Sequence, residues 1–292
     1  MNSLKETIQN IFGRSTAIIR RTSAFGGDIN RAYVLELSDG SKVFMKGNSP
    51  KNIDFFESEA AGLEAMRKTG TVRVPKVLGY GTDGGESFLL LECIESGGRN
   101  RNSMAELGRG LAEMHLAETG GFSGGGRYGF VRDNYIGASP QTNAPADTWI
   151  DFFRERRLVP QFEWASGYFS SEDRKGINRL LDGLDRFLTE PEQPSLLHGD
   201  LWGGNYMIDR NGSPWLIDPA TYVGHAEADL AMTELFGGFD RAFYDAYKET
   251  AGIDPGYRDR RDLYNLYHLL NHLNLFGGGY LHSVLSIIRR YV

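Results

Sequence analysis

Short apolar runs separated by turn residues dominate the first 95 residues of the chain. Residues 31–40 and 41–48 hold two such runs joined by Asp39-Gly40, a pair typical of tight hairpins. Residues 74–96 read as two more strands with a glycine-rich turn between them. The pattern therefore predicts a small antiparallel sheet.

One segment between these strands has a helical period instead. In residues 54–70, apolar side chains recur at helical spacing and Gly70 lies where a helix would stop. The recurring face carries Phe55, Glu59, Leu63 and Met66. Glu59 should therefore point toward the sheet, whereas Glu57 lies about 200° away around the helix axis.

The pattern changes after Gly97 and Gly98, and helical periods prevail from there to the end of the chain. Five segments show it: residues 103–118, 148–165, 176–188, 230–249 and 264–290. The exception is a hairpin in which Asn211-Gly212 joins residues 205–209 to residues 214–218. This part is predicted to be mostly helical, with one hairpin inserted.

These patterns predict an α+β fold with two lobes. The 292 residues can fill a sizeable core. The boundary is expected near residues 95–100, so that residues 1–95 form a small lobe of antiparallel sheet with one helix. Residues 96–292 then form the larger helical lobe.

Charge and composition exclude several classes of partner. The formal net charge is −6, and the densest basic run is only Arg154, Arg156 and Arg157, so no nucleic acid partner is expected. No apolar stretch approaches the roughly 20 residues that a membrane-spanning helix requires. The single cysteine, Cys93, cannot form an internal disulfide, and residues 1–15 lack the apolar core of a signal peptide, which favours the cytoplasm.

Candidate chemistry is concentrated in residues 196–209, LLHGDLWGGNYMID. Asp200 is followed five residues later by Asn205, and Asp218 lies beyond the hairpin. This set provides one carboxylate for a substrate hydroxyl and two oxygen ligands for Mg²⁺, the residues that phosphoryl transfer requires. His198 is expected to brace the loop. Taken singly, each of these residues reads better as a loop residue that caps a turn or satisfies backbone groups, and only the combined spacing favours a site.

A kinase site also needs a lysine on a strand and an acidic residue on the next helix. Lys46 ends the apolar run VFMK of the predicted hairpin, and Glu59 faces the sheet from the following helix. Without these partners Lys46 would read as an ordinary surface lysine.

Glycines that could surround a phosphate precede that lysine. Gly26 and Gly27 lie at the predicted turn between two strands, where backbone amides could approach a nucleotide. The segment matches neither the P-loop nor the Rossmann pattern. Asp28 adds a negative charge there, and its side chain could point outward or bind a substrate amine. A formal G-x-G-x-x-G at Gly124 follows a helix rather than a strand and is read as a loop.

Five further positions are candidates by their place in the chain. Glu92, Cys93 and Ile94 lie in the predicted connector between the lobes, whose backbone would contact adenine in a kinase; Cys93 itself reads as a small buried apolar group. His268 and His272 could share a helix face as a metal pair, but they lack a third ligand nearby and are interpreted as packing or substrate-side residues.

Across its whole length the sequence resembles the fructosamine kinase (ketosamine-3-kinase) family, within the aminoglycoside and choline kinase-like group. The resemblance rests on FGGDINRAYVLEL, RDNYIGASPQ, PWLIDPATYVGHAEADLAMTELFGGF and NHLNLFGGGY, and above all on GDLWGGN around Asp200. It implies a protein-kinase-like fold that uses ATP and Mg²⁺. It also implies transfer to the 3-hydroxyl of the sugar of a ketosamine, free or on protein lysines, whose unstable 3-phosphate releases the amine in protein deglycation and repair.

The resemblance also implies roles for individual residues. Asp200 would be the catalytic base, Asn205 and Asp218 the magnesium ligands, Lys46 the ATP phosphate anchor and Glu59 its partner. Trp202 would face the substrate, although a core position is an equally open interpretation. Two alternatives remain: a kinase of another alcohol or amine, such as an aminoglycoside or choline, and a nucleotide-binding module without catalysis.

Overall fold

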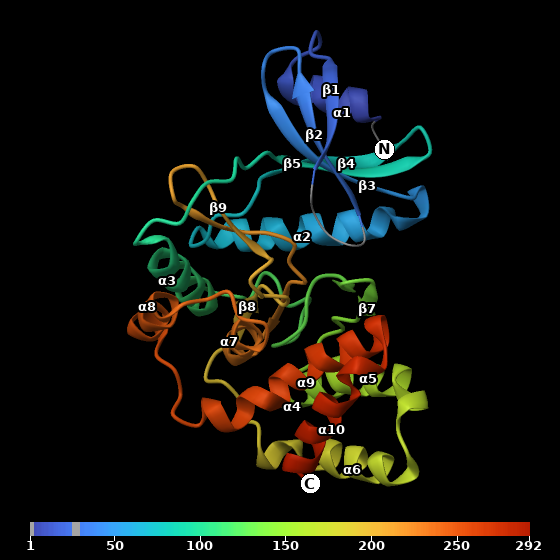
Figure 1. Cartoon of the computed structure of the whole chain (residues 1–292), viewed down its shortest axis with the longest axis vertical. Helices are drawn as coiled ribbons and strands as arrows, with labels where there is room; N and C mark the ends of the chain where they lie inside the picture. Colours follow the sequence, from blue (N-terminus) through green and yellow to red (C-terminus); the bar gives the residue numbers. More distant parts are fainter. Residues whose placement is uncertain (1–2, 25–29) are drawn as a thin grey trace.

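A computed structural model describes residues 3–24 and 30–292 of the chain (Figure 1). The antiparallel sheet lies at one end of the molecule, the helices gather at the other, and α2 crosses between them (Figure 1). The predicted α+β class is therefore confirmed. No helix within the described part of the chain has both the length and the apolar character needed to cross a bilayer.

The five-stranded sheet has the order β1-β2-β3-β5-β4, with every neighbouring pair antiparallel. Both predicted hairpins are present, and Gly40 turns the first with a φ of 87° that favours glycine. The strands are β1 (Ile18–Ala24), β2 (Arg31–Leu37), β3 (Lys42–Asn48), β4 (Val77–Asp83) and β5 (Glu86–Glu92).

Two helices, not the one predicted, cover this sheet. The N-terminal α1 (Leu4–Phe12) is only nine residues long and is started by a capping box between Ser3 and Glu6, a signal that the reading of hydrophobic periods missed. It covers a small apolar cluster to which Phe88 and Leu90 of β5 belong. The alternate residues of β5 face the main core beside α2, which explains the continuous apolar run of this strand.

The predicted inserted helix is α2 (Ile53–Thr69), and Gly70 ends it in the left-handed conformation, with a φ of 70°. Leu63 and Met66 are buried as expected, but Phe55 is only partly buried. The fully buried ring is that of Phe56, whereas Phe55 lines the same cavity as Glu59 and Leu63 and stacks on Tyr135. Phe55, Glu59 and Leu63 therefore lie on one face of α2, as predicted.

The remaining helices pack around a second, larger part of the core. In the predicted helical segment 103–118, Leu107, Leu111, Met114 and His115 recur at helical spacing and are all buried. The helices and single turns are η1 (Pro50–Asn52), α3 (Ser103–Leu116), α4 (Trp149–Phe152), the π-helical η2 (Phe153–Leu158), α5 (Val159–Trp164), η3 (Ser166–Tyr168), α6 (Ser171–Asp182), η4 (Leu184–Arg186), α7 (Ala226–Leu235), α8 (Arg241–Ala251), α9 (Tyr257–Phe276), η5 (Gly278–Tyr280) and α10 (Leu281–Arg290).

Three two-stranded ladders lie between the sheet and these helices. The predicted hairpin is formed by β9 (Tyr206–Ile208) and β10 (Pro214–Leu216), with Gly212 at a φ of 82°. β8 (Ser195–Leu197) pairs with β11 (Tyr222–Gly224), and β6 (Asn134–Ile136) pairs with β7 (Ser139–Gln141). As predicted, the segment around Gly124 is a loop.

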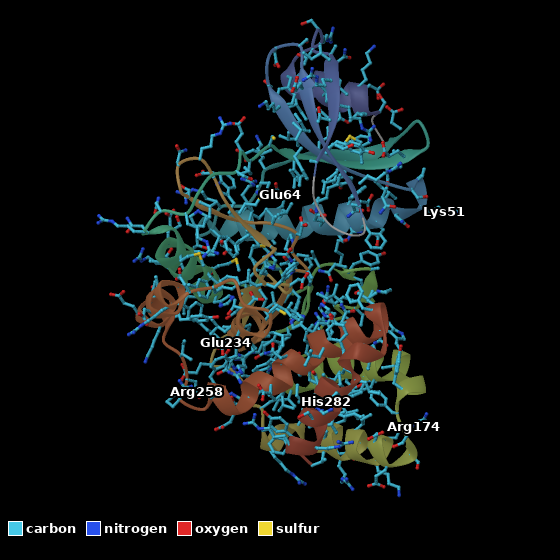
Figure 2. All side chains as sticks on the ribbon, in the orientation of Figure 1. Lys51, Glu64, Arg174, Glu234, Arg258 and His282 are labelled. Carbon is cyan, nitrogen blue, oxygen red and sulfur yellow. The ribbon has the colours of Figure 1, made fainter. Side chains whose placement is uncertain are left out.

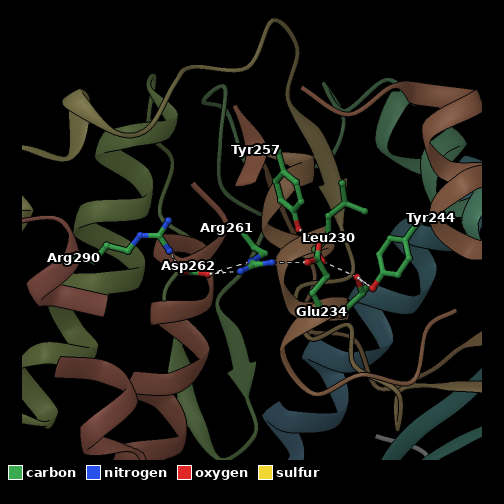
Figure 3. Close-up of polar contacts among 8 residues, drawn as sticks. Leu230, Glu234, Tyr244, Tyr257, Arg261, Asp262 and Arg290 are labelled. Carbon is green, nitrogen blue, oxygen red and sulfur yellow. Dashed lines mark hydrogen bonds and ion pairs between the residues drawn. The ribbon is translucent and has the colours of Figure 1, made fainter. Parts of the chain in front are cut away.

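Ion pairs connect α7, α9 and α10. Glu234 of α7 accepts hydrogen bonds from the Tyr257 hydroxyl at 2.7 Å and from Arg261 of α9 at 2.9 Å (Figure 3). Arg261 also contacts Asp262, which pairs in turn with Arg290 of α10 (Figure 3). This chain of charges fixes α9 against α7 and α10, and α9 forms one wall of the site described next.

Candidate active site

A cavity of about 1030 Å³ lies where the sheet, α2, the loop after β8 and α9 meet. Figure 2 shows side chains of the sheet and α2 on one side of this junction and side chains of the helical part on the other. The cavity wall contains every predicted site residue that the structure describes, namely Lys46, Glu59, Glu92, Cys93, Ile94, Asp200, Trp202, Asn205, Asp218, His268 and His272. The predicted Gly26 and Gly27, with Asp28, lie outside the described residues.

Lys46 is held between two carboxylates. Its Nζ lies 2.7 Å from Glu59 Oε1 and 2.6 Å from Asp218 Oδ1, and only 8% of the residue is exposed. Strand alternation places it there, because its neighbours Val43 and Met45 face the cluster under α1 and leave Lys46 on the opposite face. Burial opposes the charge, but the two carboxylates outweigh it and raise the pKa of Lys46, which remains a cation.

The structure also shows that the two candidate glutamates on α2 have different partners. Glu59 points at Lys46, whereas Glu57 forms an ion pair with Arg132 at 3.4 Å. Burial and the nearby Asp218 carboxylate raise the pKa of Glu59 against the opposing effect of Lys46. The helical geometry thus predicted which glutamate faces the strand.

Asp200 lies in the loop between β8 and β9, in contact with Asn205. The amide Nδ2 of Asn205 donates to the backbone oxygen of Asp200 at 2.7 Å and to Asp200 Oδ2 at 3.1 Å. Burial, aided by the Asp218 and Asp229 carboxylates, raises the pKa of Asp200 to about 7 despite that hydrogen bond. A carboxylate with such a pKa can accept a proton near neutral pH.

Asp229 of α7 holds this loop from behind, and the sequence reasoning missed it. Its two carboxylate oxygens accept the backbone N–H groups of His198 at 2.7 Å and Gly199 at 2.8 Å. Burial opposes its ionisation, but hydrogen bonds from His115 and the backbone prevail and lower the pKa of Asp229. The signal that could have identified Asp229 is a charged residue placed between apolar residues of a helix.

His198 braces the same loop, as expected. Its ring Nε2 lies 2.9 Å from the carbonyl oxygen of Ile217, beside Asp218, and burial lowers the pKa of the ring, which keeps it neutral. Gly199 has a φ of 83°, and a Cβ there would collide with the carbonyl of Ala220. Among the described residues, Asp218 is the only non-glycine with a positive φ, at 55°.

The opposite side of the cavity is aromatic. Trp202 is 41% exposed, so the alternative of a core position is wrong. The ring of His272 lies 4.9 Å from Phe236 and 5.1 Å from Tyr280, centroid to centroid. Burial lowers the pKa of His268 to about 3 and also lowers that of His272, so both rings are neutral.

The histidines do not assemble a metal site. Nδ1 of His272 lies 2.8 Å from the carbonyl oxygen of His268 within α9, and His268 itself is 5% exposed. Within residues 3–24 and 30–292, no group of three or more His, Cys, Asp or Glu side chains is placed to hold a metal ion. His268, buried, and His272, partly buried, both lie in the wall of the cavity, which agrees with the packing or substrate-side interpretation.

The predicted connector begins at Glu92, the last residue of β5, and continues beyond the strand. Glu92, Cys93 and Ile94 all line the cavity, on the side of the sheet. Cys93 is only half-buried rather than buried as expected, because it lies at the cavity edge; burial still raises the pKa of its thiol.

The chain is similar to known proteins over nearly its whole length. A family model described as fructosamine kinase matches residues 1–292. The chloroplastic protein-ribulosamine 3-kinase of Arabidopsis thaliana is 44% identical over 283 residues, which cover 96% of this chain and 85% of that protein. The corresponding protein of Oryza sativa subsp. japonica is 43% identical over 284 residues, covering 96% and 81%.

Solved structures show the same relationship. One from Thermobifida fusca YX-ER1, whose description names a fructosamine-3-kinase, superposes with a TM-score of 0.84 at 32% identity and covers 99% of this chain and 98% of that one. The aminoglycoside phosphotransferase APH(4)-Ia, in a complex with ADP and hygromycin B, has a TM-score of 0.61 at 15% identity, covering 99% and 98%. That second likeness shows the fold alone.

Proposed function

The chain belongs to the fructosamine kinase family, and we propose that it transfers phosphate from ATP to the 3-hydroxyl of the sugar part of a ketosamine. The observation that carries this proposal is the meeting of Lys46, Asp200 and Asp218 in one cavity. The acceptor could be a ribulosamine, an erythrulosamine or a fructosamine, free or on a protein lysine. The resulting 3-phosphate releases its amine, so the reaction serves deglycation and repair.

Two residues act on the reacting groups. Lys46, a cation held by Glu59 and Asp218, binds the ATP phosphates and offsets their charge. Asp200, with a pKa of about 7, orients the sugar 3-hydroxyl and accepts its proton. Asp229 and His198 keep Asp200 in place through the backbone of the loop.

The residues present suit a magnesium ion. The Asn205 amide nitrogen is engaged by Asp200, which leaves Oδ1 as the atom for a cation, and Asp218 offers a carboxylate that is 35% exposed at the cavity. One amide and one carboxylate oxygen match the few protein ligands that Mg²⁺ takes beside phosphates and water. Bound there with ATP, the ion would supply positive charge to the phosphates.

The aromatic side of the cavity would hold the acceptor. Trp202 presents an exposed indole from the same loop as Asp200, where it can pack on a sugar ring or an ammonium group. His268 and His272 contribute neutral rings to the same wall. The connector of Glu92, Cys93 and Ile94 would take the adenine on the opposite side.

The proposal also includes the division of the chain into two lobes and a location in the cell. Residues 1–95 would form the ATP-binding lobe, and residues 96–292 the catalytic and substrate-binding lobe. A cytoplasmic location agrees with the single half-buried cysteine, which has no internal disulfide partner.

The comparisons favour this function over both alternatives. The relatives named for ribulosamine are 43 to 44% identical, whereas the aminoglycoside phosphotransferase shares only the fold, at 15%. A module without catalysis would not need to retain Lys46, Asp200 and Asp218 together.

A coupled assay of ADP release tests the proposal. The protein is incubated with ATP, Mg²⁺ and one of four acceptors: ribulose-lysine, fructose-lysine, choline or kanamycin. We expect turnover with one or both ketosamines, and phosphorus NMR should show a 3-phosphate ester. Turnover of choline or kanamycin alone would assign the chain to another acceptor. Nucleotide binding without turnover of any acceptor would make it a binding module.

Calorimetry tests the magnesium site without turnover. ATP affinity is measured with Mg²⁺ and with EDTA, for the wild type and for Asn205→Ala. We expect Mg²⁺ to strengthen ATP binding by the wild type and to have less effect on the variant. An equal effect on both proteins would remove Asn205 from the proposed ligands.

A further inference from the structure

The β6–β7 hairpin and the residues just before it contact both segments that hold Lys46. This hairpin lies far in sequence from both segments, and the proposed function assigns it no role. Its contacts form two groups, one on α2 and one on the segment that follows Asp218.

The first group attaches the start of α2. The Arg132 guanidinium pairs with Asp54 and, at 3.4 Å, with Glu57, and the Tyr135 hydroxyl donates to Asp54 Oδ2 at 2.9 Å. The rings of Phe55 and Tyr135 are stacked, with centroids 3.8 Å apart and planes inclined by 15°. Asp54 lies in the first turn of α2, where the helix dipole also favours a carboxylate. These contacts fix the end of α2 that leads to Glu59.

The second group attaches the segment after Asp218. The side chain of Asn134 in β6 donates to the carbonyl oxygen of Thr221 at 2.8 Å. That of Gln141 in β7 donates to Ala220 O at 3.1 Å and to Asn134 Oδ1 at 2.7 Å. Both side chains are buried, so these bonds do not exchange freely with water.

The two segments also touch each other directly. At Gly62, in the middle of α2, a Cβ would lie 2.9 Å from Thr221 Oγ1. Only glycine allows α2 to approach the segment after Asp218 so closely. The hairpin therefore bridges two elements that are already in contact, and it limits how far they can separate.

We propose that residues 132–141 form a clasp that holds α2 against the Asp218 segment, so that Glu59 and Asp218 keep Lys46 in place. Arg132 and Asp54 are then positioning residues for phosphoryl transfer. Neither Arg132 nor Asp54 lines the cavity, so their effect on nucleotide use must pass through α2 or through Tyr135, which does line it. The inference rests on the proposed function for its activity readout, but nucleotide binding tests it independently of the acceptor.

The experiment is a double-mutant cycle between Arg132→Ala and Glu59→Gln. For each protein, kcat and KM for ATP are measured with saturating ketosamine, and the Kd of AMP-PNP is measured by calorimetry. Arg132→Ala alone should lower kcat/KM for ATP by about tenfold and weaken AMP-PNP binding, because Glu59 leaves Lys46 part of the time. In the Glu59→Gln background it should cost less than about twofold, since the contact that it positions is already lost.

Two further variants act as controls. Arg67→Ala removes an ion pair within α2, to Glu64, that reaches no other element, so it should leave both readouts unchanged. Arg132→Lys keeps the charge and should recover part of the lost activity. If Arg132→Ala fails to fold, Asp54→Asn takes its place in the cycle.

Two results would overturn the clasp. One is an unchanged kcat/KM and Kd in folded Arg132→Ala. The other is the same fold-loss in the presence and absence of Glu59, because a merely structural residue acts additively with the site. If no ketosamine is turned over at all, the proposed function fails while the AMP-PNP cycle still decides the clasp.

Discussion

Replacing Asp200 by asparagine should abolish activity and at the same time stabilise the fold. The carboxylate lies in the cavity wall, where burial and the Asp218 and Asp229 carboxylates raise its pKa from 3.8 to about 7. A raised carboxylate pKa means that the folded state disfavours the ionised form more than the unfolded chain does. Asparagine has nearly the same shape and keeps an oxygen that can accept from Asn205, but it removes the charge.

The size of the stabilisation follows from the pKa shift. A shift of about three units corresponds to about 4 kcal/mol of unfolding free energy above pH 7, at about 1.4 kcal/mol per unit. Asp200 is partly exposed at the cavity, and water there reduces this upper limit, so we expect a gain of about 1–3 kcal/mol. The gain is full above the folded pKa of about 7, falls as pH decreases, and vanishes near pH 4, where the carboxyl is protonated in both states.

Thermal unfolding and ADP release measure the two effects. At pH 8 the melting temperature of Asp200→Asn should exceed that of the wild type by about 2–6 °C, and at pH 5 by less than half of that. Turnover should fall by about 10²–10⁴-fold, as expected for loss of a general base, while ATP affinity stays within about twofold. The matched control is Asp209→Asn: Asp209 is hydrogen-bonded by Trp215, Ser213 and Asn211, which lowers its pKa, so that variant should gain no stability at pH 8.

Two results would refute this reasoning. A stabilisation of Asp200→Asn that is equal at pH 5 and pH 8 would show that the charge of Asp200 does not cause it. Near-normal turnover by the same variant would remove Asp200 from the reaction.

Four further variants test the neighbouring groups. Lys46→Met should lower kcat/KM for ATP by at least about 10²-fold, and unchanged ATP kinetics would exclude its role as phosphate anchor. Asp229→Asn should lower the unfolding free energy by about 2–4 kcal/mol, because an amide cannot accept both backbone N–H groups as a carboxylate does; a stable variant in denaturant titration would contradict this. Gly199→Ala should lose about 2 kcal/mol or more and most turnover through its collision with Ala220, and a folded, active variant would argue against it. Glu227→Gln leaves Asp254, among the described residues, as the only carboxylate paired with buried Arg260, so the unfolding free energy should fall by about 1–3 kcal/mol in the same titration. An unchanged unfolding free energy would show that the ion pair contributes nothing.

Local signals in the sequence were sufficient for the elements and for the groups that face the reaction. Asp39-Gly40 and Asn211-Gly212 placed two hairpins correctly because a tight turn depends on a few adjacent residues. The helical period placed Glu59, not Glu57, opposite Lys46, because side-chain direction on a helix follows from spacing alone. The hydrophobic pattern did not predict the short helix α1, because the signal for this helix is a capping box rather than a long helical period.

What only the tertiary structure decided concerns contacts between distant segments. The sequence could not show that Asp229 accepts the backbone of the Asp200 loop, since the two lie about 30 residues apart with no common period. Nor could it show that Arg132 and Tyr135 hold α2 from more than 70 residues away. The raised pKa of Asp200 also depends on burial and on two remote carboxylates. Composition and spacing specify which groups are available, but only packing brings them within reach and removes the water between them.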